Sequence, residues 1–245
     1  MIFYLKTGKR KNHFIVKLIK CVTTLQNLML KSHRKIKIIF FVSVLLFTWF
    51  SLCLPSKLFN EPTSFVIEDS EGNLLNASIA SDGQWRFPYD EKVPEKFIKC
   101  ITTFEDKRFY SHPGIDFMAL GRALIKNMKS MRVVQGGSTL TMQVLRLSRD
   151  KPKRNLWEKT IEGIQSLRLE CSYSKNEIMA MYASNAPFGS NVVGLDAASW
   201  RYFGRSPDKL SWGEMAALAV LPNAPSLVHP GKNRTTLLEK RNALL

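Results

Sequence analysis

The strongest constraint on this sequence is an uncharged apolar run, IIFFVSVLLFTWFSLCL, which begins at Ile38 and ends at Leu54. As a helix, the run is about long enough to cross the hydrocarbon core of a bilayer, where unpaired backbone groups are costly. The basic cluster KSHRKIK precedes it, and Pro55 follows it as a stop. By the positive-inside rule the N-terminus then stays in the cytoplasm. We therefore predict a single-pass transmembrane anchor over residues 38–54.

A cleaved signal peptide is the alternative interpretation of this run. No small-x-small cleavage site follows the run, and its apolar stretch is longer than the usual core of a signal peptide. An anchor is therefore favoured. The predicted location is the cell inner (cytoplasmic) membrane, with the chain beyond residue 54 on the periplasmic or outer side.

The net charge of +16 would by itself suggest a nucleic-acid partner. However, ten of the Lys and Arg residues precede Ile38, and the first acidic residue is Glu61, so the remainder carries only +6. Most of the positive charge therefore reflects membrane topology, and no nucleic acid is expected as a partner.

The basic leader, residues 1–37, has two interpretations that the sequence leaves open. It is mildly amphipathic, so it could lie on an anionic membrane surface. Alternatively, translation starts at Met29, which opens the compact basic string MLKSHRKIK that an anchor normally has.

The chain beyond the anchor divides into two parts that differ in predicted secondary structure. Residues 55–92 read as a linker and a small β segment, with strands in SFVIED and LLNASIA, the turn EGN between them, and an extended piece in GQWRFPYD. Residues 93–245 read as one mainly α domain, with helices predicted in PEKFIKCITTFEDKRFY, DFMALGRALIKNMKSM, STLTMQVLRLS and RNLWEKTIEGIQSLRLEC. Asp116 is a predicted helix cap, and capping boxes are predicted from Ser174 to Glu177 and from Ser211 to Glu214.

Four cysteines are present, and only Cys100 and Cys171 lie beyond the anchor. Their spacing is not of a metal-binding type. Both lie in apolar helical contexts, so small buried residues are favoured over a disulfide.

Three segments contain residues that could act in catalysis or ligand binding, and each segment also has an ordinary structural explanation. Glu105 and Asp106 end an apolar helix. There, desolvation can raise the pKa of a carboxylate, as a general acid or base requires. Alternatively, each carboxylate is an ordinary helix cap or a surface charge. The loop from Gly136 to Thr139 opens onto a helix N-terminus, which suits phosphate oxygens, or an ordinary Ser or Thr cap. It lacks the lysine of a nucleotide P-loop.

The third segment is the predicted helix that carries Lys159 and Glu162. An apolar stripe of Trp157, Ile161, Ile164, Leu167 and Cys171 predicts its buried side and places Lys159 and Glu162 on the far face. The two charges are either a solvated ion pair or a charged face turned into a cleft.

Five blocks, taken in order, resemble the signature of the peptidoglycan glycosyltransferases, glycosyltransferase family 51. The blocks are FEDKRFYSHPGID, QGGSTLTMQ, the pair Lys159 and Glu162, YASNAPFG and AALAVLPNAPS. The resemblance runs from about Asp90 to the end of the chain, and the order and intervals of the blocks make it specific. The strings DGQWRFP and NAPFGSNVVGLDAASWRYFGRSP are most similar to the penicillin-binding protein 1C subtype. A mainly α, lysozyme-like fold is implied.

The resemblance also implies a reaction, the lengthening of glycan strands from lipid II with inversion. Glu105 corresponds to the general base that takes the proton from the 4-hydroxyl of the acceptor GlcNAc, whose oxygen attacks the anomeric carbon of the donor MurNAc. Glu162 corresponds to a second essential carboxylate near the undecaprenyl pyrophosphate leaving group, where a divalent cation (Mg²⁺ or Mn²⁺) can assist. The implied partners are lipid II, the growing strand, the membrane and other cell-wall synthesis proteins.

The family's substrate-binding positions fall on further residues of these blocks. They are Asp106, Phe109, His112, Gly137, Ser138, Thr139, Gln143, Arg146 and Lys159. Among them, Ser138, Thr139, Gln143, Arg146 and Lys159 are expected to hold the pyrophosphate and the donor sugar. Cations and helix N-terminal amides are what a diphosphate leaving group requires.

The sequence departs from the family pattern in two places. The third block usually begins Arg-Lys, and here Glu158 precedes Lys159, so either a neighbour such as Arg154 compensates or donor binding is weaker. The chain also ends at Leu245, where relatives of this subtype continue into a transpeptidase. The strings SYSK from Ser172 and KTG from Lys6 match penicilloyl-serine motifs only by chance, so we predict no transpeptidase domain and no acylation by β-lactams.

Three classes of function are open on the sequence. Lipid II polymerisation is favoured over a lysozyme-like glycan hydrolase, because the Gly-Gly-Ser-Thr loop and the anchor suit a lipid-linked pyrophosphate donor. An inactive truncated fragment of a bifunctional protein is the third. The stretch MALGRALIKNMKSMRVV, residues 118–134, is the candidate for contact with the bilayer, and core packing explains it equally well.

Overall fold

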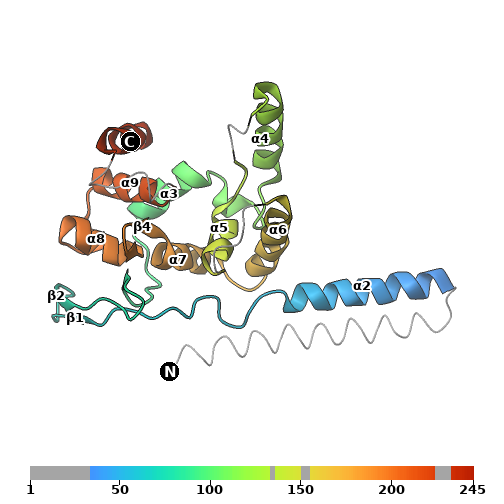
Figure 1. Cartoon of the computed structure of the whole chain (residues 1–245), viewed down its shortest axis with the longest axis horizontal. Helices are drawn as coiled ribbons and strands as arrows, with labels where there is room; N and C mark the ends of the chain where they lie inside the picture. Colours follow the sequence, from blue (N-terminus) through green and yellow to red (C-terminus); the bar gives the residue numbers. More distant parts are fainter. Residues whose placement is uncertain (1–33, 133–135, 150–154, 224–232) are drawn as a thin grey trace. The chain divides into compact units, whose positions relative to one another are not determined.

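The computed structural model of this 245-residue chain describes residues 34–132, 136–149, 155–223 and 233–245 (Figure 1). The chain divides into two compact units, Met1–Cys53 and Leu54–Leu245. The first unit contributes helix α2 to the described part, and the second contains the remaining helices and two small sheets. The predicted mainly α fold with a small β segment is confirmed.

Helix α2 (Arg34–Leu52) contains the predicted anchor and begins one turn earlier than expected. Its window Lys35–Leu52 is long and apolar enough to cross a membrane, judged by length and composition. The hydroxyls of Ser43, Thr48 and Ser51 each donate to the carbonyl four residues earlier, at 2.8 Å in every case. These polar groups are therefore satisfied within the helix, as an apolar environment requires.

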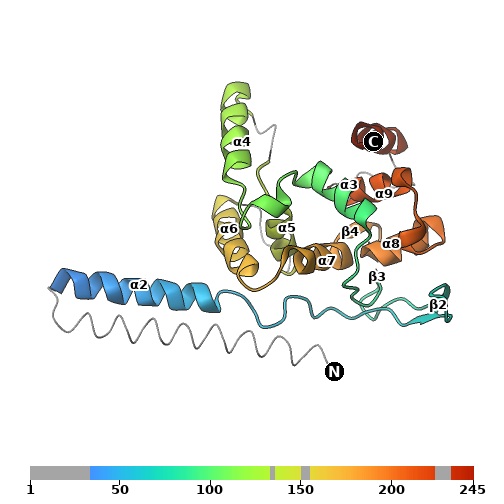
Figure 2. The same ribbon diagram turned by 180° about the vertical axis from the view of Figure 1, so that it is seen from behind.

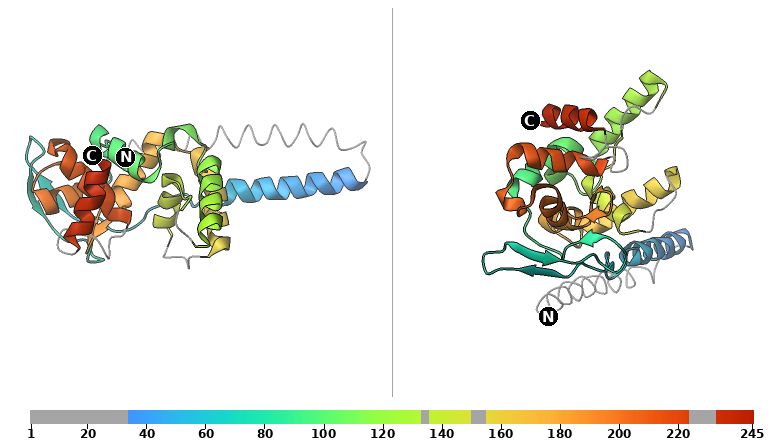
Figure 3. Two further views of the ribbon diagram at one scale, coloured as in Figure 1. Left: turned by 90° about the horizontal axis from the view of Figure 1, so that it is seen from above. Right: turned by 60° about the vertical axis from the view of Figure 1, so that its left-hand side comes forward.

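The predicted hairpin is present at the start of the second unit. Strands β1 (Val66–Glu68) and β2 (Leu74–Ala77) pair antiparallel. Asp69 closes the turn between them, because its carboxylate accepts 2.8 Å hydrogen bonds from the backbone N–H groups of Glu71 and Asn73. Figure 3 shows the hairpin at the opposite end of this unit from helix α4.

A second sheet joins segments that are far apart in the sequence. Strand β3 (Trp85–Arg86) runs parallel to β5 (Val192–Val193), which pairs antiparallel with β4 (Pro187–Gly189). The sequence predicted the extended piece around Trp85 but not the two later strands, since two or three residues are too few for an alternating pattern. This sheet ties the segment of residues 55–92 to the helical region, whose core also includes Leu58 and Phe87.

Helices make up most of the second unit. They are α3 (Glu95–Glu105), α4 (Phe117–Ser130), α5 (Leu140–Leu147), α6 (Leu156–Glu170), α7 (Lys175–Asn185), α8 (Leu195–Phe203), α9 (Trp212–Val220) and α10 (Arg234–Leu244). The predicted cap at Asp116 is confirmed, since its side chain accepts from Ala119 N. Both predicted capping boxes are also present, at the starts of α7 and α9.

The core lies among several of these helices. Helix α3 packs against α9, and α5 packs against both α6 and α7. The fully buried side chains include Phe97, Ile101, Leu140, Leu145, Ile178, Tyr182 and Met215. Helix α10 lies against α9 and α3, with Leu237 buried beneath it. The core therefore fixes the end of α3 and the whole of α5 relative to each other.

Helix α4 extends away from the other helices of this unit (Figure 2). Along it, Ala123 is the one buried hydrophobic residue. Large apolar side chains face solvent instead, namely Phe117, Met118, Leu124, Ile125, Met128 and Met131. Core packing, one of the two explanations that the sequence left open for residues 118–132, does not account for these exposed side chains, and contact with the bilayer stays a prediction. Residues 133 and 134 of that stretch lie outside the described part of the chain.

The predicted buried side of α6 is wrong. Trp157 is 70% exposed, and Ile161, Ile164 and Leu167 are half-buried. The buried residues are instead Glu162, Gly163, Ser166 and Leu169. The helix approaches its neighbours closely, which requires small side chains at the contact, so the apolar stripe does not mark the packed face.

Cys171, predicted to be buried, is exposed at the C-terminal end of α6, while Cys100 is buried as expected. Both are free thiols, in agreement with the preference against a disulfide. The exposure of Cys171 has the same cause as the wrong helix face, because this cysteine was the last member of the predicted stripe.

The close approach at α6 depends on Gly114. This residue has a φ of +96°, and a Cβ placed on it would lie 2.7 Å from the carbonyl oxygen of Ser166. An L-residue with positive φ costs about 1–2 kcal/mol, and overpacking adds about 1–3 kcal/mol. The loop therefore needs glycine for both its conformation and its contact.

We expect Gly114→Ala to lower the free energy of unfolding by about 1–3 kcal/mol more than Gly204→Ala, because only Gly114 adds a clash to the backbone strain. Gly204 is a matched control, with φ +66° and no atom within 4 Å of its added Cβ. Denaturant unfolding of the chain in detergent measures both. Equal losses would contradict the close contact.

Candidate active site

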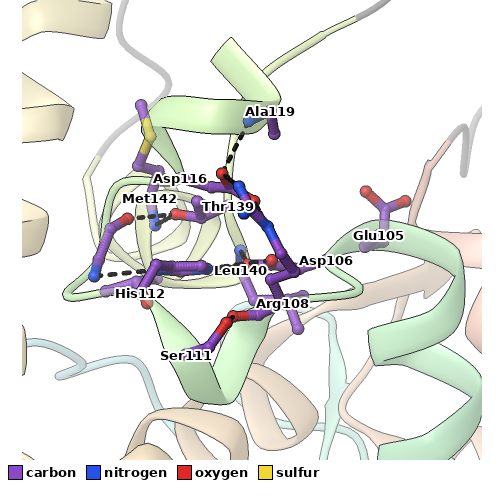
Figure 4. Close-up of polar contacts among 12 residues, drawn as sticks. Glu105, Asp106, Arg108, Ser111, His112, Asp116, Ala119, Thr139, Leu140 and Met142 are labelled. Carbon is purple, nitrogen blue, oxygen red and sulfur yellow. Dashed lines mark hydrogen bonds and ion pairs between the residues drawn. The ribbon is translucent and has the colours of Figure 1, made fainter. Parts of the chain in front are cut away.

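The Asp106 carboxylate is the centre of a buried polar cluster that follows helix α3 (Figure 4). The residue is 6% exposed. Its Oδ2 accepts a 3.0 Å hydrogen bond from the backbone N–H of Leu140, the first residue of α5. Both carboxylate oxygens also lie 3.0 Å from Nε2 of His112. Asp106 thus joins the end of α3 to the start of α5.

The ring of His112 is held in one tautomer. The backbone N–H of Gly114 donates to its Nδ1 at 3.1 Å, so Nδ1 acts as an acceptor. A neutral imidazole with Nδ1 as acceptor has its proton on Nε2, which donates to Asp106. The His-Pro-Gly turn is therefore fixed to the same carboxylate that fixes α5.

Thr139 occupies the N-cap of α5 and completes this cluster. Its Oγ1 accepts from Met142 N at 3.2 Å and donates to the carbonyl oxygen of Gly114 at 2.6 Å. Gly137 is buried, and a Cβ there would lie 3.1 Å from Cα of Leu120 on α4. The interpretation of the loop as an ordinary threonine cap is confirmed. Ser138 is half-buried beside it.

Phe109 packs beneath the cluster in the short 3-10 turn Phe109–Ser111. It is 1% exposed, and Nζ of Lys175 lies 4.5 Å from its ring centroid. Asp106, Phe109, His112, Gly137 and Thr139, all predicted to bind substrate, are therefore buried against one another or against α4 and α7. Their burial favours a role in positioning the backbone over direct contact with a ligand.

Glu105 has a different environment from its neighbour. Its carboxylate is directed away from the Asp106 cluster (Figure 4) and is half-buried. Oε2 accepts a 3.0 Å hydrogen bond from Nε2 of Gln143 on α5. Oε1 accepts a 3.1 Å hydrogen bond from Nδ2 of Asn223, which follows α9. The structure therefore places the predicted pair Glu105 and Gln143 in contact.

Glu162 lies among cations on the buried side of α6. Burial raises the pKa of its carboxyl above the usual range, and the Glu158 carboxylate adds to that shift. The positive charges of Arg146, Arg149 and Lys159 act in the opposite direction and lower the pKa. The predicted residues Arg146 and Lys159 are thus close enough to Glu162 to interact with it electrostatically.

Glu158, which departs from the family pattern, is paired with Arg149. Nη2 of Arg149 lies 2.6 Å from Oε2 of Glu158, so the guanidinium at the end of α5 neutralises the anion at the start of α6. Arg154, the neighbour expected to compensate if donor binding is not weakened, lies outside the described residues, and Arg149 is the cation that pairs with Glu158. Within the described chain, Nη1 of Arg149 is buried and has no hydrogen-bond partner.

Helix α5 connects the two carboxylates. Its cap Thr139, followed at helical spacing by Gln143 and Arg146, gives one face that carries three predicted residues. Gln143 contacts Glu105, and Arg146 interacts with Glu162. Because Asp106 and Thr139 fix the first turn of this helix, they also fix the position of both contacts.

The string SYSK has no nucleophilic arrangement. Nζ of Lys175 donates to the carbonyl oxygen of His112 and to Oε1 of Glu170, at 2.7 Å each. The hydroxyl of Ser172 accepts from the guanidinium of Arg168. The lysine is thus part of the helix packing, in agreement with a chance match.

In the described ranges, no group of three or more His, Cys, Asp and Glu side chains could hold a metal ion. Magnesium commonly binds through one or two carboxylates together with substrate phosphates, so a full protein cage is not required for it. The Glu162 carboxylate is the group at this site that fits such a shared cation.

Three residues of this region were not selected from the sequence. Asn223 stands in the block AALAVLPNAPS, which was recognised only as a whole, and Arg149 lies beyond the periodic part of α5. Lys240, whose Nζ donates to Oδ1 of Asn223 at 3.1 Å, belongs to a helix that the sequence did not predict. The sequence did contain a signal for Arg149, because an anion at Glu158, where the family usually has Arg, indicates that a nearby cation pairs with it. Nothing local in the sequence indicated Lys240.

The sequence of this chain is similar to several known proteins. The family model described as Transglycosylase matches residues 72–245, and a model described as Protein of unknown function (DUF1029) matches residues 12–54. Penicillin-binding protein 1C of Escherichia coli (strain K12) is 40% identical over 187 residues, which cover 74% of this chain and 23% of that protein. Penicillin-binding protein 1A of Aquifex aeolicus (strain VF5) is 34% identical over 184 residues, 75% of this chain and 25% of that protein.

One solved structure is also similar. The crystal structure of penicillin-binding protein 1A from Haemophilus influenzae aligns with 76% of this chain and 18% of that chain, at 21% identity and a TM-score of 0.38. The chain thus spans about a quarter or less of the length of the relatives that it matches.

We expect Glu162→Gln to raise the melting temperature near neutral pH. The folded-state pKa of Glu162 is raised, so its stabilising protonation is complete below the ordinary value of 4.5 and is lost as the pH rises through the folded pKa. Glutamine does not titrate, so the gain should shrink as the pH falls towards 4.5.

Thermal unfolding across this pH range tests the prediction. Glu158→Gln is the control, because it removes the partner of Arg149 and should not stabilise the chain. A Glu162→Gln variant that is less stable than the wild type near neutral pH would refute the account.

Proposed function

Because the chain belongs to the transglycosylase family, we propose that it is a membrane-anchored peptidoglycan glycosyltransferase that polymerises lipid II into glycan strands. The observation that carries this proposal is the pair of carboxylates joined by α5. Glu105 is held by two amide donors, and Glu162 lies among three cations. One carboxylate is thus arranged to accept a proton, and the other marks a region that suits an anionic leaving group.

Glu105 is the proposed general base. Its two oxygens accept hydrogen bonds from Gln143 and Asn223, which orient the carboxylate without giving it a proton. It takes the proton from the 4-hydroxyl of the acceptor GlcNAc as that oxygen bonds to the anomeric carbon of the donor MurNAc. The bond from that carbon to the diphosphate oxygen breaks, and undecaprenyl diphosphate leaves from the opposite face with inversion.

The leaving group is proposed to lie near the start of α6. The positive charges of Arg146, Arg149 and Lys159 act on Glu162 there, and cations stabilise the charge that develops on a departing diphosphate. Ser138, half-buried at the start of α5, is a further candidate contact. A divalent cation shared between the diphosphate and Glu162 would add to this neutralisation.

The membrane is the proposed location of the substrate encounter. Helix α2 has the length and composition of a membrane span. Independently, α4 exposes apolar side chains next to Lys126, Lys129 and Arg132, a combination that suits the boundary between acyl chains and anionic headgroups. A lipid-linked donor that diffuses laterally would then reach the site without leaving the bilayer. We place the catalytic unit on the periplasmic or outer side.

We expect purified full-length chain to convert labelled lipid II into polymer that moenomycin inhibits. Glu105→Gln should reduce the rate at least about a hundredfold, the usual contribution of a general base. Glu95→Gln is the matched control, because Glu95 is an exposed glutamate of the same helix.

The outcome of this assay separates the remaining alternatives. Shortening of pre-made glycan that depends on Glu105 would support a hydrolase instead. Neither polymer nor cleavage would support a non-catalytic role and refute the proposal.

The pair of Glu158 and Arg149 gives a second prediction about the donor site. In Glu158→Arg the cation of Arg149 is released and another is added, so we expect lipid II to bind about tenfold more tightly, or about 1.4 kcal/mol. Glu71→Arg makes the same charge change in the exposed hairpin turn and controls for attraction to anionic lipid. Unchanged affinity in Glu158→Arg would show that Glu158 does not weaken donor binding.

A further inference from the structure

Glu105 is the first member of a chain of three side chains that ends on α10. Nδ2 of Asn223 donates to Oε1 of Glu105 at 3.1 Å, and Oδ1 of Asn223 accepts from Nζ of Lys240 at 3.1 Å. The three residues come from α3, the turn after α9, and α10. Lys240, which is 135 positions from Glu105 in the sequence, is thereby linked to the Glu105 carboxylate through the side-chain amide of Asn223.

The amide of Asn223 can adopt only one orientation in this chain. A lysine ammonium has donors and no acceptor, whereas an ionised carboxylate has acceptors and no donor. The amide oxygen must therefore face Lys240, and the amide nitrogen must face Glu105. Without Lys240, the carboxylate would still disfavour the amide oxygen, but nothing would hold that oxygen in place, so the Asn223 side chain could rotate away from Glu105.

The position of Lys240 is itself fixed by packing. Leu237, one turn earlier on α10, is 7% exposed and lies in the core, and α10 packs against α9 and α3. No carboxylate of the described residues lies within ion-pair distance of Nζ of Lys240. Its polar contact in that part of the chain is the hydrogen bond to Asn223.

We propose that Asn223 and Lys240 are positioning residues that orient the Glu105 carboxylate for proton abstraction. Gln143 fixes one oxygen of Glu105, and Asn223, set by Lys240, fixes the other. This inference rests on the proposed function, because it assigns the two residues to the reaction that Glu105 performs. As positioning residues they act through Glu105, so we expect their loss to lower kcat and to leave KM nearly unchanged.

The test measures the steady-state polymerisation of lipid II by the full-length chain in detergent. Lys240→Met should lower kcat about tenfold and leave KM within about twofold, because a misdirected base loses rate and not affinity. Lys240→Arg keeps a donor-only cation and should retain kcat within about twofold. Asn223→Leu removes the bridging amide and should lower kcat at least as far as Lys240→Met.

Two comparisons distinguish positioning from general stabilisation. Lys209 donates to Oδ1 of Asn73 at 2.9 Å, so Lys209→Met breaks a similar exposed bond away from Glu105 and should leave kcat unchanged. In the Asn223→Leu background, Lys240→Met should have no further effect, because the lysine acts only through the amide.

Three results would overturn the proposal. They are an unchanged kcat in Lys240→Met, a loss that Lys209→Met reproduces, and a loss that persists in full in the Asn223→Leu background. A Lys240→Met variant whose kcat falls only in step with its melting temperature would equally assign Lys240 to stability alone.

A second readout is independent of turnover. The side-chain amide resonance of Asn223 in ¹⁵N-labelled chain should shift in both Glu105→Gln and Lys240→Met, and stay unchanged in Lys209→Met. If the wild type does not polymerise lipid II but this resonance responds, the proposed function fails while the positioning contact stands. If it polymerises and Lys240→Met has wild-type kcat, the positioning role fails alone.

Discussion

The buried Asp106 carboxylate is the interaction on which the arrangement of this site depends. An ionised group is expensive to bury unless its oxygens are paired, and here they accept from the Leu140 N–H and from His112. In return, the carboxylate satisfies a donor at the N-terminus of α5, whose first turn would otherwise lack a partner for it. The end of α3 and the start of α5 are thereby held together. Since Glu105 is the last residue of α3, its distance from Gln143 follows from that bond.

As a consequence, the adjacent acidic residues Glu105 and Asp106 have different environments and different roles. Asp106 is inside the fold, while Glu105 is half-buried and held only by amides. Removing either partner of a buried charged hydrogen bond costs more than removing a solvated one, so Asp106 is the member whose loss endangers the fold. Glu105, half-buried and hydrogen-bonded to two amides, is the member of the pair that is left for the chemistry we propose.

Local signals predicted most of the helices and caps, and ordered blocks identified the family. The helix caps could be predicted because a cap is formed by residues that are close in the sequence. The caps at Asp116, Ser174 and Ser211 are examples. The buried face of α6 could not be predicted, since its contact depends on Gly114 and Ser166 meeting across 52 residues. The same limit applies to the bond between Asn223 and Glu105, which are 118 residues apart. Contacts between distant segments leave no periodic pattern, and they decide which of the predicted residues meet.

The pairing of Glu158 with Arg149 bears on the donor site that we propose, because it sets the charge between the end of α5 and the start of α6. An anion at the start of α6 is favourable for the helix dipole but unfavourable for the diphosphate of the donor that we propose to bind there. Arg149 lies against Glu158 and leaves the pair neutral, while Arg146 and Lys159 continue to face Glu162. The cationic character of the region is therefore a property of α5 and α6 together and not of one position. The family pattern identifies only the anion at Glu158, whereas the fold also shows that Arg149 is occupied in pairing with it, so two side chains decide the charge available to the proposed donor.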